Sequence, residues 1–172
     1  MLVSVLFILF LVFIMPNMAS RTDTESTMNR SPDLSLVYTP EDLYQMAEGY
    51  GGEGRAEYIK MRVTFDRGWP LVYMVFLTAA ISWLYRRTFN PGSAWQLANL
   101  APVLGALFDY LENIGASIVM ARYPETTPVI DLATPLMTLI KWLFVGGSFV
   151  LLVIGLILMF IILTRANQLG AA

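Results

Sequence analysis

Asp109 is the residue whose type and position most strongly suggest chemistry in this chain. It lies midway along an apolar stretch between Trp95 and Tyr123, and hence near the bilayer centre if that stretch crosses a membrane. A charged side chain at that depth costs roughly 2.5–3.5 kcal/mol on insertion scales, so such residues are functional hypotheses by default. Glu112 and Asn113 follow one helical turn later on the same face. The alternative is that these groups only join helices through hydrogen bonds, which contribute about 0.6 kcal/mol on average.

Lys141 is the cation that the sequence offers to these acids. Two carboxylates one turn apart in a low-dielectric site need a nearby cation, or one of them must hold a proton. We take Tyr123 and Ala133 as the boundary of two successive membrane helices. At about 1.5 Å per residue, Lys141 then lies about 12 Å deep and Glu112 about 16 Å deep. The sequence therefore predicts a Glu112–Lys141 ion pair, with Asp109 deeper.

A second set of polar and aromatic side chains follows one face of a helix predicted over residues 55–87. At 100° per residue, these side chains fall within about 80° of one another. They are Arg55, Tyr58, Arg62, Asp66, Trp69 and Tyr73. One interpretation makes them the rim of the polar centre, with Arg62 and Asp66 closing the cluster. The other makes them an interfacial girdle, in which such residues anchor a helix at headgroup level.

The elements that must position these residues are apolar helices. Apolar residues make up 56% of the 172 residues and charged residues 14%, against about 25% charged in an ordinary soluble domain. Since only helices and closed barrels cross lipid, and these apolar runs lack the alternation of a barrel, we predict an all-α, polytopic transmembrane helix bundle. It has four spans, or three if residues 1–19 are a cleaved signal peptide. The predicted spans are residues 1–16, the later part of 55–87, 95–123 and 134–165.

A short helical segment is expected outside the membrane. Residues 17–38 are rich in Ser, Thr, Asp, Asn and Pro and predict a flexible linker. Residues 39–54 predict a short interfacial helix, which begins at Thr39 and ends in a glycine hinge. For the last span, Thr134 is the expected N-cap, because Pro135 suits the first helical position.

The arginines of the short loops predict the orientation. Arg86 and Arg87 form a loop without acids, and Arg165 lies in a tail without acids. Positive loops favour the cytoplasm, so we expect a multi-pass membrane protein with a cytoplasmic C-terminus and with residues 17–68 extracytoplasmic. The six Lys and Arg residues within 16–68 favour the opposite orientation.

Composition excludes several classes of function. The chain has no Cys and no His, which removes thiol redox chemistry, the commonest metal ligands and hydrolysis by a Ser–His or Cys–His pair. We predict no metal and no cofactor. A net charge of −2 gives no reason to expect nucleic acid as a partner.

The pattern favours a pocket that faces the outer leaflet and binds a lipid or small amphiphile. Its floor is Asp109, Glu112, Asn113 and Lys141, and its rim contains Arg55, Tyr58, Arg62, Asp66 and Tyr73. Enzymatic activity stays open, although the residues favour binding without catalysis.

Two other functions are alternatives to this pocket. One is an accessory or assembly subunit of a larger membrane complex, which docks through the small residues Gly146, Gly147 and Ser148. The other is a proton-coupled transporter, which needs a homo-oligomer because three or four helices are few for that task.

Overall fold

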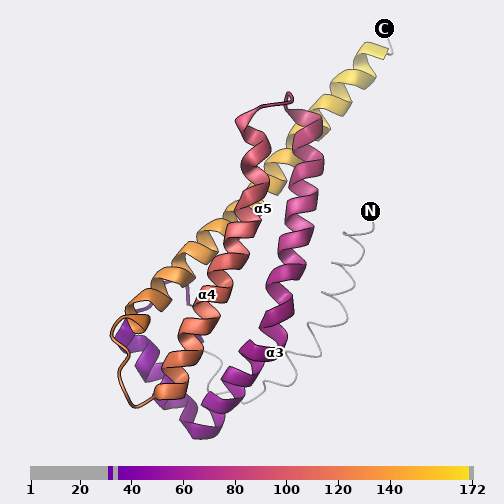
Figure 1. The fold of residues 1–172 in the computed structure, drawn as a ribbon. Helices are drawn as coiled ribbons and strands as arrows, with labels where there is room; N and C mark the ends of the chain where they lie inside the picture. The colour runs from indigo at the N-terminus through magenta and orange to yellow at the C-terminus, as the bar shows by residue number, and fades with distance from the viewer. Residues whose placement is uncertain (1–30, 33–34, 171–172) are drawn as a thin grey trace.

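The computed structural model describes residues 31–32 and 35–170, and the regular elements of this part of the chain are all helical (Figure 1). They are α3 (Pro40–Thr88), the 3-10 helix η3 (Ala94–Leu100), α4 (Ala101–Arg122) and α5 (Ile130–Gly170). The predicted all-α class is confirmed for these residues. Three helices are long and apolar enough to cross a membrane. The predicted first span, residues 1–16, lies outside the described residues.

The three long helices pack side by side, with α4 antiparallel to α3 and α5 (Figure 1). The first turns of α3 cross the end of the bundle where α4 ends and α5 begins. At the opposite end, the last part of α5 projects beyond the other two helices.

Local sequence signals determine how α3 begins and where it breaks. The hydroxyl of Thr39 accepts from the Asp42 amide at 3.2 Å, and the Asp42 carboxylate accepts from the Thr39 amide at 2.8 Å. This capping box starts the helix at the predicted place. Gly51 has φ 62° and ψ −178°, a backbone region that is essentially restricted to glycine. The expected glycine hinge therefore falls at Gly51, and the helix resumes without a break in the chain to Thr88.

The predicted third span, residues 95–123, matches the candidate membrane span Ala94–Arg122, which consists of η3 followed by α4. Pro102 lies in the first turn of α4, where its missing N–H costs nothing. One predicted boundary differs from the structure. The last helix begins at Ile130 rather than at Thr134. Thr134 is therefore not an N-cap: its hydroxyl donates to the Ile130 carbonyl at 2.7 Å, inside the helix.

Two apolar clusters flank a polar layer along the bundle. One cluster joins the first half of α3 to the end of α4, and it contains Tyr38, Leu43, Met46, Ala47, Tyr58, Ala116, Val119 and Met120. The other joins the second half of α3 to the middle of α4 and α5, and it contains Tyr73, Leu77, Ile81, Leu84, Tyr85, Ala106 and Val145. On α4, the layer between the clusters holds Asp109, Glu112 and Asn113, all of them buried.

Two glycines of α4 bring α5 close on either side of this polar layer. A Cβ on Gly105 would lie 2.9 Å from Cγ2 of Val145, and one on Gly115 would lie 2.4 Å from Oγ1 of Thr134. Side chains larger than hydrogen cannot fit at these separations. These two contacts align α5 with α4 at positions on either side of the polar layer.

We expect Gly115→Ala to destabilise the protein by about 1–3 kcal/mol, because the added methyl group overpacks the contact with Thr134. Gly147→Ala is the matched control, since a Cβ at Gly147 meets no atom within 4 Å among the described residues. The control should be neutral or slightly stabilising, because alanine is the better helix former. Thermal unfolding in detergent micelles measures both. Equal stability of the two variants would contradict the proposed close contact.

Candidate functional site

The central feature of the site is the contact between Lys141 on α5 and Glu112 on α4. The Lys141 ammonium forms an ion pair with Oε2 of Glu112 and lies 3.9 Å from Oδ1 of Asp109. All three residues are buried, and Glu112 has no exposed surface. The Glu112–Lys141 pair predicted from relative depth is thus confirmed. Two carboxylates share one ammonium group, so the cluster is a compact charged centre inside an apolar bundle.

The two carboxylates differ in their hydrogen bonds. Oδ2 of Asp109 accepts from the Tyr73 hydroxyl at 3.0 Å, and Oδ1 accepts from the amide of Asn113 at 3.1 Å. Both oxygens of Asp109 therefore have donors. Oε1 of Glu112 and Oδ1 of Asn113 are buried and accept no hydrogen bond from the described residues. A buried acceptor without a donor costs about 1–3 kcal/mol, so these two atoms need an explanation.

The predicted rim divides into two parts. Arg62 forms an ion pair with Asp66 one turn along α3, and its guanidinium lies 4.4 Å from the ring centroid of the buried Tyr58. Arg62, Asp66 and Tyr58 therefore form a second charged group, which precedes Tyr73 on α3. Tyr73 joins the first group directly through Asp109.

Arg55 takes a different direction from the one expected. Its guanidinium donates to the Ala47 carbonyl at 2.9 Å and lies 4.9 Å from the ring centroid of Tyr123. The cause is the break at Gly51, which folds the first turns of α3 back and presents the Ala47 carbonyl to Arg55. Arg55 therefore stabilises this bend, and its contacts with the described residues do not include the carboxylates of Asp109 and Glu112.

The partners of the two carboxylates lie near one end of the charge-free runs of α3 and α5. Tyr73, the partner of Asp109, is only four residues into the charge-free run of α3 that begins at Trp69. Lys141 directly precedes the charge-free run of α5 that begins at Trp142. The mid-depth position of Asp109 in a membrane, taken from the midpoint of 95–123, stays a prediction, whereas its partners lie near one end of these charge-free runs. The polar layer is therefore displaced toward the end covered by the first turns of α3.

Tyr38 is a residue of the site that the sequence analysis missed, because it falls in the predicted linker 17–38. Its ring is buried, and its hydroxyl is 2.9 Å from the hydroxyl of Thr138, one turn before Lys141 on α5. Burial raises the pKa of the Tyr38 phenol well above its ordinary value, and the charge of Glu112 adds to the rise. Tyr38 directly precedes the Thr39 cap and packs in one cluster with Leu43. This arrangement is a hydrophobic staple, a signal that could have located Tyr38 in advance.

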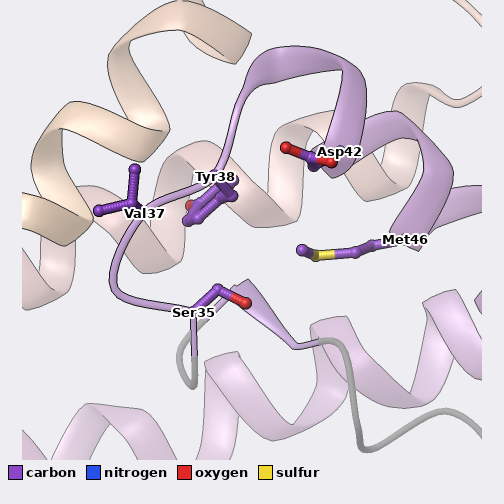
Figure 2. A pocket seen from close by; sticks show the side chains of 5 residues that line it. All are labelled: Ser35, Val37, Tyr38, Asp42 and Met46. Carbon is purple, nitrogen blue, oxygen red and sulfur yellow. The ribbon is translucent and has the colours of Figure 1, made fainter.

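Two pockets border Tyr38. The first has a volume of about 180 Å³, and Figure 2 shows the side chains that line it: Ser35, Val37, Tyr38, Asp42 and Met46. The second has a volume of about 170 Å³ and an almost wholly apolar lining of Leu36, Val37, Tyr38, Pro135, Leu136 and Leu139. The carboxylates of the polar centre line neither pocket. Tyr38 belongs to both pockets and, through Thr138, reaches the helix face that carries Lys141.

A further polar contact fixes the first turns of α3 over this end of the bundle. The Tyr44 hydroxyl donates to Oδ2 of Asp131 at 2.9 Å and accepts from the Thr127 amide at 2.7 Å. The contact joins α3 to the loop before α5 and to the first turn of α5. Tyr44 therefore holds the first turns of α3, which follow Tyr38 in the chain, against the start of α5.

Comparison with known proteins gives no functional assignment. Among the described residues, no group of three or more His, Cys, Asp or Glu side chains is placed to hold a metal ion. No family model, curated protein or solved structure matches this chain.

We expect Lys141→Met to destabilise the protein by about 3–5 kcal/mol, because it leaves the carboxylate of Glu112 buried without its cation. Combining it with Glu112→Gln should recover part of the loss, since the uncompensated charge is then removed. Lys60→Met, at an exposed position on α3, is the control and should change little. Thermal unfolding of the four proteins in the same detergent measures these effects. Strictly additive losses in the double variant would show that the two side chains are not coupled.

Proposed function

We propose that this chain is an integral membrane protein that binds a lipid or small amphiphile beside Tyr38, with the polar end of the ligand directed toward Glu112. The observation that carries the proposal is the fully buried Glu112, whose Oε1 accepts no hydrogen bond from the described residues. A binding site displays a few such polar groups within a mainly apolar surrounding.

The two pockets at Tyr38 support an amphiphile in particular. The pocket that contains Leu136 and Leu139 is lined by apolar side chains and opens beside an exposed apolar face of α5, as an acyl chain requires. The pocket that contains Ser35 and Asp42 offers polar atoms, as a headgroup requires. Tyr38 lies where the two meet, so one molecule with a polar end and an apolar chain fits both.

The position of the site along the helices also supports this function. The headgroup of a lipid lies at the end of the hydrocarbon layer, and the polar layer lies toward one end of the apolar runs. Following the arginines of the short loops, we propose that this end faces the extracytoplasmic side, with residues 17–68 there and the C-terminus in the cytoplasm.

A docking role in a larger membrane complex is the second candidate. The observation that favours it is the open face of α5 at Gly146 and Gly147, where an added Cβ would meet no atom within 4 Å among the described residues. Gly155, by contrast, packs closely against Leu84 and Tyr85 of α3. Gly146 and Gly147 are therefore available to a neighbouring helix, whereas Gly155 packs within the chain.

We expect Leu139→Trp to reduce the amount of amphiphile that co-purifies with the protein by about ten-fold, because an indole fills much of the apolar pocket. Leu143→Trp is the matched control, one turn further along α5 and outside that pocket. Solvent extraction and mass spectrometry of equal amounts of protein measure the bound lipid. Equal retention by Leu139→Trp and the wild type, with both proteins folded, would overturn the proposed site.

A further inference from the structure

We infer that the polar end of the bound amphiphile is an ammonium group with N–H donors, which seats against Glu112 and Asn113. This inference rests on the proposed function and specifies the chemical class of its ligand.

The charges around the site favour a cation. Lys141 is the ammonium shared by two carboxylates, those of Glu112 and Asp109. The other buried acid on α3, Asp66, is paired with its own Arg62. A phosphate or carboxylate headgroup would bring a further negative charge to this place, whereas an ammonium group offsets the excess.

The hydrogen-bonding capacity of the site favours donors. Within the polar layer of α4, Oε1 of Glu112 and Oδ1 of Asn113 are buried acceptors that receive no hydrogen bond from the described residues. Both atoms belong to the same buried layer of α4. A primary ammonium carries three N–H donors and no acceptor, and it therefore complements this pair of atoms. A quaternary ammonium carries the same charge but no N–H donor.

Tyr38 defines the path by which such a group reaches the carboxylate. Its hydroxyl bonds to Thr138, one turn before Lys141, and its side chain lines both pockets. In the proposed path, the Tyr38 side chain rotates away from Thr138 and lets the ammonium group pass from the pockets to the polar centre. The chain of the ligand stays in the apolar pocket at Leu136 and Leu139, while its ammonium group passes Tyr38.

Four probes with the same chain length test the inference on the full-length protein in neutral detergent. They are dodecylamine, dodecyltrimethylammonium, dodecanol and dodecyl phosphate, and calorimetric titration measures the affinity of each. We expect dodecylamine to bind at least about ten-fold more tightly than each of the others, a difference typical of one charge-assisted hydrogen bond. Equal binding of dodecyltrimethylammonium or dodecanol, or tighter binding of dodecyl phosphate, overturns the ammonium assignment while the proposed function stands. Binding of none of the four overturns the proposed function as well.

Glu112→Gln tests the residue assignment. It should weaken dodecylamine binding by about ten-fold and leave dodecanol binding unchanged within about two-fold. Glu57→Gln, at an exposed position on α3, should leave both unchanged. Equal loss with the two variants, or no loss with Glu112→Gln, overturns the assignment.

Lys141→Met provides a second test, which does not need Glu112 to be altered. It removes the ammonium that the two carboxylates share, and an added amine can then replace it. Dodecylamine should raise the midpoint of thermal unfolding of this variant more than that of the wild type or of Lys60→Met. Equal shifts in the three proteins would show that the amine does not reach Glu112, and would overturn the inference.

Discussion

The burial of Glu112 against Lys141 is the interaction on which the rest of the arrangement depends. A carboxylate without exposed surface needs a cation, and that cation comes from a different helix. Removing one partner of such a pair costs far more than the pair itself contributes. The contacts at Gly105 and Gly115, on either side along α4, hold α5 at the separation that the pair requires. The two apolar clusters exclude water from the layer between them.

The sequence predicted those features that depend on distance along a helix. The rise per residue placed Glu112 and Lys141 at similar depths in two antiparallel helices, and the pair is present. The cap at Thr39 and the break among the glycines follow from backbone preferences of single residues, and both are present. The predicted start of α5 at Thr134 was wrong by one turn. Ser and Thr also donate to carbonyls inside helices, and Thr134 does so.

Features that depend on tertiary contacts were not predictable in the same way. Tyr38 reaches Thr138 across 100 positions of sequence, and no local pattern specifies such a partner. Arg55 shares a helical face with Arg62, but the bend at Gly51 supplies it with the Ala47 carbonyl instead. The depth of Asp109 in a membrane stays a prediction, because the apolar length of one helix does not specify how the bundle sits in lipid. The ligand, the orientation and the partners are proposals, since they depend on molecules outside this chain.

The two close glycine contacts and the ion pair of Lys141 also oppose a shift of α5 along α4. A shift of α5 by one turn, about 5.4 Å, would move Lys141 past Glu112 and bring Thr138 or Val145 toward it. Neither side chain carries a charge, so the carboxylate of Glu112 would then be buried without its cation. Featureless apolar helices lack such a penalty, because many alignments bury similar areas. In this chain the buried Glu112 carboxylate therefore favours one alignment of α4 and α5, the one that places Lys141 beside it.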